Sequence, residues 1–279
     1  MACTVCRGYS GDLEVPIALR DLVLFVPVLF LLWVAAGRFG GMAVAAVDRG
    51  VPFELTAARI ATFAREVVGR ALLRTLTPLG YFFPMPPGRG DDDVPVLVVG
   101  EPGARAHLVF LVTWLRLHGH ARVWAVDCGG TRMPLAARGA EVAGRIAELV
   151  RSTGAPVVDV VGFSMGGLAA AWAIRHGENT ALVRRFVTIA TPWRGTRLAV
   201  FDVPHIPYEI RYGASILDDL VAPGVPTTTL WGDDDPIVVP ATSAAADGTV
   251  TCAVHGGGHH ELLLSGRVYR AISAVLDAA

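Results

Sequence analysis

Lysine is absent from this 279-residue chain, and all 24 of its basic residues are arginine. Alanine and glycine are abundant, which is typical of proteins encoded by GC-rich genomes, so a single arginine is weak evidence for a binding site. The arginines are balanced by 25 acidic residues, and the net charge is −1. A chain without excess positive charge lacks the electrostatic footprint of a nucleic-acid-binding protein. We therefore expect no nucleic-acid partner.

Cysteine is also scarce, with four residues in the whole chain. Cys3 and Cys6 form a C-x-x-C pair, but no second pair follows, so the spacing does not predict a zinc site. Cys128 and Cys252 lie in or just after predicted strands and are interpreted as ordinary thiols. The sequence also contains no internal repeat and no phosphate-binding glycine loop. We expect neither a metal nor a cofactor.

Long apolar runs are confined to the N-terminal third. Residues 22–37 carry no charge, and after Arg38 the run continues to residue 47. A membrane-spanning helix needs about 20 apolar residues, so 22–47 is predicted to be a transmembrane or membrane-inserted helix after a polar segment, 1–21. A signal peptide is disfavoured because the run is too long and mixed charges precede it. The remaining alternative is a buried helix of a soluble domain.

A second, amphipathic helix is predicted within 48–83. Its apolar residues recur at helical spacing, and its arginines fall largely elsewhere, as expected for a helix on an anionic membrane surface. The alternative interpretation is that this helix packs on the following domain. The proline-rich segment 84–93 is predicted to be a stiff linker. The excess of arginine after residue 47 favours the cytoplasmic side for the C-terminal domain.

Residues 94–279 alternate between short apolar runs and helical stretches. Near-continuous Val/Ile/Leu runs are typical of parallel strands buried on both faces, and their alternation with helices predicts a doubly wound, mostly parallel α/β sheet of about six strands. The predicted strands are 94–100, 121–127, 157–162, 186–190, 227–231 and 249–254. The predicted helices are 104–118, 136–152, 165–177, 213–221 and 262–278.

A G-x-S-x-G motif, residues 162–166, lies where a predicted strand meets a predicted helix. A serine on such a turn stands clear of the sheet, which is the arrangement of a nucleophile elbow, so Ser164 is the candidate nucleophile. A serine nucleophile needs a base and an orienting acid, which follow later in the chain in this type of site. The alternative is a glycine-rich turn with an incidental serine.

Candidates for both partners follow the last two predicted strands. A carboxylate and an imidazole in these loops both face the sheet edge at which Ser164 is expected. The candidates for the acid are Asp233, Asp234 and Asp235, and those for the base are His259 and His260.

Together these motifs resemble those of the α/β-hydrolases, most closely the small bacterial lipases and esterases with a minimal lid. The stretch 232–238 resembles the family's G-x-x-D-x-[IV]-V pattern and selects Asp235, while 255–259 resembles H-G-x-G-H and selects His259. The stretch 191–196 resembles a T-P-x-x-G-T turn that many lipases carry. Some bacterial members also resemble this layout in having apolar N-terminal helices. The resemblance implies hydrolysis of carboxylic esters through an acyl-enzyme.

In this family the oxyanion hole is formed by two backbone N–H groups, which the resemblance assigns to Met165 and Glu101. The family usually carries His-Gly-x at the second position, whereas this chain has Val99-Gly100-Glu101. A carboxylate pointing inward would oppose a developing oxyanion, so we expect Glu101 to point outward or to meet an arginine such as Arg105.

The segment 191–225 is the candidate lid. Its large apolar residues either line a substrate groove or pack in the core, and the candidates are Trp193, Phe201, Ile206 and Tyr208. An ester or lipid substrate and a membrane are the expected partners. Two alternatives remain for the function: an acyltransferase with the same triad, or an inactive membrane-anchored binding module. The sequence does not indicate an oligomeric state.

Overall fold

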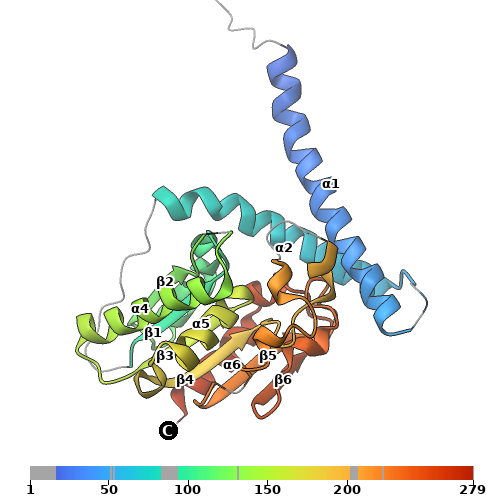
Figure 1. Cartoon of the computed structure of the whole chain (residues 1–279). Coiled ribbons are helices and arrows are strands. Elements are labelled where there is room, and N and C mark those ends of the chain that lie inside the picture. The colour runs from blue at the N-terminus through green and yellow to red at the C-terminus, as the bar shows by residue number, and fades with distance from the viewer. Residues whose placement is uncertain are drawn as a thin grey trace, which may run out of the picture.

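A six-stranded sheet lies at the centre of the molecule, and every pair of neighbouring strands in it is parallel (Figure 1). The computed structural model describes residues 17–50, 52, 54–82, 94–130, 132–201, 207–221 and 223–278. The strand order is β2-β1-β3-β4-β5-β6. The strands are β1 Val96–Gly100, β2 Val123–Asp127, β3 Val158–Phe163, β4 Val183–Ile189, β5 Thr227–Gly232 and β6 Val250–Val254. All six correspond to strands predicted from the sequence.

The order of the strands predicts a ligand crevice at the carboxyl ends of β1 and β3. From β1 the chain first moves to β2 on one side and then crosses to β3 on the other, so the direction of winding reverses between β1 and β3. In an open parallel sheet, the loops that leave the strands on either side of such a reversal separate and form a ligand crevice. The loop after β1 begins at Glu101, and the turn after β3 carries Ser164.

Helices cover both faces of the sheet. On β1, Leu97 and Val99 pack toward α4 and α5, whereas Val96 and Val98 pack toward α3 and α6. This alternation explains why the strand reads as an unbroken apolar run. The helices are α3 Val109–Leu117, α4 Leu135–Thr153, α5 Met165–His176 and α6 Gly266–Asp277. The short 3₁₀ turns are η1 Arg105–Leu108, η2 Thr180–Leu182, η3 Arg197–Phe201, η4 Tyr208–Ile210, η5 Ser215–Leu217, η6 Ala241–Ala244 and η7 Glu261–Leu264.

The predicted helix over 213–221 is wrong. The segment forms only the turn η5. Gly213 adopts a left-handed φ of 73°, Ala214 is extended, and Pro223 follows the segment, so helical backbone is confined to the few residues between them.

Two N-terminal helices, α1 Ile17–Asp48 and α2 Ala57–Phe82, precede the sheet. Figure 1 shows α2 lying across the domain. Glu66 and Leu73 of α2 are completely buried, and Leu73 belongs to the same core cluster as the strands and α6. Of the two interpretations of this helix, packing on the domain is therefore the one observed, and the core of the domain includes a side chain from α2.

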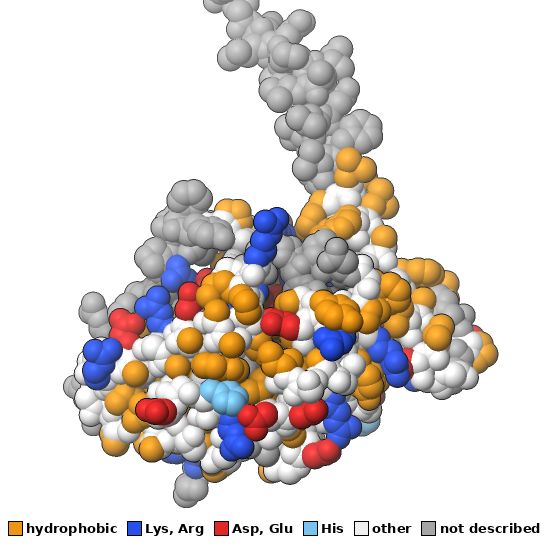
Figure 2. All heavy atoms as spheres, in the orientation of Figure 1, with side chains coloured by type: hydrophobic (Ala, Val, Ile, Leu, Met, Phe, Trp, Pro, Cys, Tyr) orange, Lys and Arg blue, Asp and Glu red, His pale blue; other side chains and the backbone are white. Residues whose placement is uncertain are grey.

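Helix α1 has two parts with different surroundings. Its C-terminal part contacts the domain so closely that a Cβ atom on Gly41 would lie 1.8 Å from the Pro236 carbonyl oxygen. Its preceding part rises away from the domain, and the five large apolar side chains of 28–33 other than Phe30 are 42–61% exposed (Figures 1 and 2). The stretch Val28–Asp48 is long and apolar enough to cross a membrane, and most of it is not buried against the domain.

Three features named from the sequence lie outside the described residues. They are the 84–93 linker, the Cys3–Cys6 pair with most of the 1–21 segment, and Ile206. Of the remaining cysteines, Cys128 is buried and Cys252 is exposed.

Candidate active site

Ser164 occupies a sharp turn between β3 and α5. Its φ of 52° is rare for a residue with a side chain, and such strain is concentrated at functional sites. The surrounding glycines are required by close approaches. A Cβ atom on Gly166 would lie 2.3 Å from the Val99 carbonyl oxygen, and one on Gly162 would lie 2.5 Å from the Gly167 Cα. The glycines of the motif therefore allow the turn to pack against the end of β1.

The structure brings Ser164, His259 and Asp235 together in one hydrogen-bonded chain. The Nε2 atom of His259 lies 2.9 Å from the Ser164 Oγ, and its Nδ1 atom lies 2.7 Å from the Asp235 Oδ2. The other Asp235 oxygen accepts backbone N–H bonds from Ile237 and Val238, at 2.7 and 2.9 Å. All three side chains are buried. This geometry allows the imidazole to accept the serine proton while the carboxylate holds its Nδ1–H.

The alternative acids have other contacts. Asp233 accepts bonds from the exposed His255 ring and from the Gly256 backbone, at 2.9 and 2.6 Å, and so joins the loops after β5 and β6. Asp234 pairs at 3.9 Å with Arg49, the residue that follows α1. Neither carboxylate has a contact with His259 in the described part of the chain.

Two opposing effects act on the pKa of His259. Burial alone would lower it, but the charge and hydrogen bond of Asp235 outweigh burial and raise the pKa above its usual value of 6.5. The imidazolium is thus stabilised in the form that follows proton transfer from the serine.

A cavity of about 290 Å³ opens beside Ser164. Met165, at the start of α5, and Glu101, after β1, both border it. The backbone N–H groups at a helix N-terminus attract negative charge, which suits Met165 to stabilising an oxyanion. Arg70 and Arg74 of α2 also line this cavity, so the second N-terminal helix forms part of its wall.

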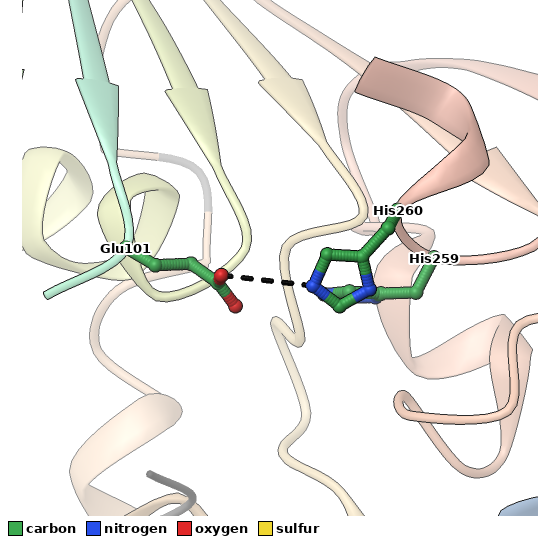
Figure 3. A group of neighbouring side chains, drawn as sticks. All are labelled: Glu101, His259 and His260. Carbon is green, nitrogen blue, oxygen red and sulfur yellow. Dashed lines mark ion pairs between the residues drawn. The ribbon is translucent and has the colours of Figure 1, made fainter. Parts of the chain in front are cut away.

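From the sequence we expected Glu101 either to point outward or to meet an arginine such as Arg105. The structure shows the second arrangement, and the arginine that Glu101 contacts is Arg70. The Glu101 Oε2 lies 3.4 Å from the Arg70 Nη1. It also lies 3.7 Å from the His260 Nε2 (Figure 3). Burial would raise the pKa of Glu101, but its polar neighbours, among them the charged Arg70 guanidinium, lower it well below its usual value. The carboxylate is ionised, and its charge is balanced by α2.

The hydrogen bonds of the His260 ring go to groups other than Ser164 and Asp235. Its Nε2 lies 2.7 Å from the Arg70 Nη1 and its Nδ1 lies 2.7 Å from the Glu66 Oε1, so the guanidinium donates to Nε2 while Nδ1–H donates to Glu66. Burial and the neighbouring Arg70 lower the pKa of His260, in keeping with a neutral ring. Arg38 of α1 contacts both Glu66 and His260, at 3.4 and 3.2 Å. We call these residues the buried charge cluster: Arg38, Glu66, Arg70, Glu101 and His260.

Glu66 connects the buried charge cluster to the backbone next to His259. Its Oε2 accepts the backbone N–H of His260 at 2.8 Å and that of Glu261 at 3.2 Å. Burial would raise the pKa of Glu66, but His260 and Arg38 lower it to about 2. A charged carboxylate from α2 thus anchors the segment that carries His259. The motifs of the catalytic domain did not predict this role.

One group in the described part of the chain, Glu101, His259 and His260, brings potential metal-ligand atoms within 4.8 Å of one another. These atoms already have other partners. The ring nitrogens of His259 bind Ser164 and Asp235, and the Arg70 guanidinium contacts both Glu101 and His260. A guanidinium at this position repels a metal cation, so the donor set suits an ion-pair network better than a metal.

The predicted substrate-binding residues have different positions. Trp193 is completely buried and packs edge-on against Phe186. It therefore packs in the core, which was the alternative to a position in a substrate groove. Phe201 is 61% exposed and borders a second cavity, described below. Tyr208 is exposed, and the Arg211 guanidinium lies over its ring.

Comparison with solved structures places this architecture among known folds. The mature form of the lipase BlEst2 from Bacillus licheniformis superposes with a TM-score of 0.57 at 16% identity, over 69% of this chain and 96% of that one. Lipase B of Aspergillus fumigatus superposes with a TM-score of 0.55 at 18% identity, over 67% of this chain and 53% of the lipase. This chain therefore spans about half the length of that lipase. An alpha/beta hydrolase fold protein from Chitinophaga pinensis superposes with a TM-score of 0.50 at 12% identity, over 68% of this chain and 91% of that protein.

Comparisons of the sequence itself give no match. No family model matches the chain, and no curated protein does. At these identities a structural likeness establishes the fold, while function depends on the site. The superpositions on solved lipases show that the chain, with its six-stranded parallel sheet, has the α/β-hydrolase fold, and an apolar N-terminal helix precedes this fold.

Proposed function

We propose that this protein is a membrane-associated serine hydrolase that cleaves carboxylic esters through an acyl-enzyme. The observation that carries this proposal is the hydrogen-bonded chain from Asp235 through His259 to Ser164, which ends at a cavity. Lipases and esterases among the solved structures of this fold support an ester as the substrate.

The proposed reaction has two halves. In the first, the Ser164 oxygen attacks the ester carbonyl carbon while His259 Nε2 takes its proton, and the Met165 and Glu101 N–H groups stabilise the oxyanion. The intermediate collapses, the leaving alkoxide takes the proton from His259, and the acyl group remains on Ser164. In the second, water attacks the acyl-enzyme with the same proton transfers, releasing the acid. Asp235 keeps the Nδ1–H of His259 in place throughout.

We expect the pH dependence of ester hydrolysis to report His259. Only the neutral ring accepts a proton, and its pKa is raised, so kcat/KM for p-nitrophenyl butyrate should fall on the acid side with a midpoint above pH 6.5. Replacing Asp235 by asparagine removes the charge that raises this pKa. The Asp235→Asn variant should lose up to about 10⁴-fold in kcat, and the midpoint of its residual activity should move to lower pH.

Asp233→Asn is the matched control, because Asp233 contacts the exposed His255 instead. This variant should keep both the rate and the pH profile. An Asp233→Asn variant with the larger loss would reverse the assignment of the acid. Failure of the wild-type protein to hydrolyse any ester would refute the proposed function.

Two apolar surfaces support membrane association. The exposed side chains of 28–33 on α1 form the first, and the second lies on α2, where Ile60, Val68 and Leu72 are 43–66% exposed. At 100° per residue these positions are turned by roughly 100–160° from the buried Glu66 and Leu73, toward the face of α2 directed away from the domain. An inserted helix beside a helix in the interfacial plane would place the Ser164 cavity close to the bilayer. The arginine-rich segment after α1 supports a cytoplasmic orientation.

Liposome flotation tests this association. Leu29 and Leu32 are each about 60% exposed. We expect the full-length protein to float with liposomes, and a Leu29→Asp/Leu32→Asp variant to stay largely in the soluble fraction, because a charged residue is costly in hydrocarbon. Leu117→Asp is the control, since Leu117 is a 76% exposed leucine on α3. Equal flotation of all three proteins would mean that α1 does not anchor the chain.

A further inference from the structure

A second and larger cavity, of about 540 Å³, lies between α1 and the domain. On one side it is bordered by α1, including Trp33, Gly37 and Gly40. On the other side it is bordered by Leu198, Phe201 and Ile237. These walls are mostly apolar, and the charged groups at its inner end belong to the buried charge cluster, in which every charge has a partner. The cavity therefore suits an uncharged, apolar occupant.

This α1 cavity adjoins the cavity of Ser164. Arg70, Glu101 and Ile237 border both. Together the two cavities have a volume in the range of sites that enclose a sizeable organic ligand. A molecule with its reacting group at Ser164 could therefore extend into the α1 cavity beside Ile237.

The glycines of α1 keep this space open. A Cβ atom added to Gly37 or Gly40 would meet no heavy atom within 4 Å, so neither glycine is required for close packing. Gly41 differs, because α1 touches Pro236 there. Glycine is about 1 kcal/mol less favourable than alanine inside a helix. Two glycines without a packing role are therefore unfavourable for the helix, and their effect is to leave volume in the cavity.

The α1 cavity also continues into the exposed apolar surface of the same helix. Trp33 borders the cavity and is itself 51% exposed, and it is the last of the exposed side chains of 28–33. An apolar chain that reaches the protein along this surface of α1 can enter the cavity without crossing water.

We infer that the α1 cavity binds the acyl chain of the substrate and that the protein acts on esters of long-chain fatty acids. This inference rests on the proposed ester hydrolysis at Ser164. The carbonyl group would lie at Ser164, the acyl chain would run past Ile237, and its end would lie against Gly37 and Gly40. The N-terminal helix thus determines the length of acyl chain that is accepted.

Filling the cavity from α1 tests the inference. The test compares p-nitrophenyl butyrate with p-nitrophenyl palmitate, using the full-length protein in detergent micelles. For Gly40→Phe, kcat/KM for the palmitate ester should fall roughly tenfold or more, because leaving about two methylene groups in water already costs roughly tenfold in binding. The value for the butyrate ester should stay within about twofold, since a short chain ends before the new side chain.

Gly37→Phe should give the same selective loss and serves as the second variant. Gly144→Phe is the matched control, because Gly144 is an exposed glycine of α4 whose added Cβ would also meet nothing within 4 Å. An unchanged ratio of palmitate to butyrate activity in both α1 variants, or an equal loss on both esters, would overturn the acyl-site inference. Hydrolysis of butyrate by these variants would then leave the proposed function standing, whereas no hydrolysis of either ester by the wild type would refute the proposed function.

Discussion

Replacing Ser164 by alanine is expected to lower kcat for p-nitrophenyl butyrate by roughly 10⁴- to 10⁶-fold. The alanine removes the only atom that can form the acyl-enzyme, while the cavity and the proposed oxyanion donors stay in place. The turn should survive, because its geometry depends on the approach of Gly166 to β1 and on the other glycines, which are unchanged. The residual rate should therefore reflect binding and oxyanion stabilisation alone.

A fluorophosphonate probe gives an independent measurement of the same residue. The wild-type protein should be labelled at Ser164, and the Ser164→Ala variant should not be labelled. Ser215→Ala is the control, because Ser215 is an exposed serine in η5. Full activity in Ser164→Ala would exclude it as the nucleophile. A folded wild-type protein without labelling would instead favour a binding module.

The fold could be predicted because its signals are local. Several strands of the sheet are short, largely apolar runs bounded by turns, and burial on both faces makes such a run continuous in β1. The positions of Ser164, Asp235 and His259 follow from the same rule, since each comes directly after a strand or in the loop that it opens. Parallel strands bring these loops to one edge.

The buried charge cluster has no comparable local signal. Its members come from α1, α2, the loop after β1 and the loop after β6, so no spacing in the sequence reports their contacts. The sequence of an apolar helix face also does not indicate whether lipid or protein covers that face. In α2 the ambiguity is greater, because apolar residues occur on both its buried and its exposed faces. The available clue was compositional: Glu66 is the one acidic residue of α2, in a helix otherwise rich in arginine.

Glu66 carries the second large prediction. Replacing it by alanine should destabilise the protein by about 3–5 kcal/mol, because breaking a buried ion pair leaves its partners uncompensated. Here those partners are Arg38 and two backbone N–H groups beside the base. For a domain of this size the melting temperature in detergent should fall by about 10 °C. Activity should fall as well, since the segment that carries His259 loses its anchor.

The matched control is Glu54→Ala, which removes an exposed carboxylate just before α2 and should change neither property. Glu66→Gln separates the two roles of the side chain, because the amide can still accept the backbone N–H bonds while it lacks the charge. If charge dominates, the glutamine variant should melt close to the alanine variant, and if the backbone bonds dominate, it should melt close to the wild type. A Glu66→Ala protein as stable as Glu54→Ala would mean that α2 does not depend on this contact.

The pH dependence of stability follows from the same carboxylate. Its pKa is about 2 in the folded protein, below the value of 4.5 for a free side chain, so ionised Glu66 stabilises the fold. That contribution is fully present above pH 4.5 and is lost as the pH falls toward 2. Acid should therefore narrow the difference in melting temperature between the wild type and Glu66→Ala. A difference that stayed constant from pH 7 to pH 3 would show that Glu66 stabilises the protein by packing and not by its charge.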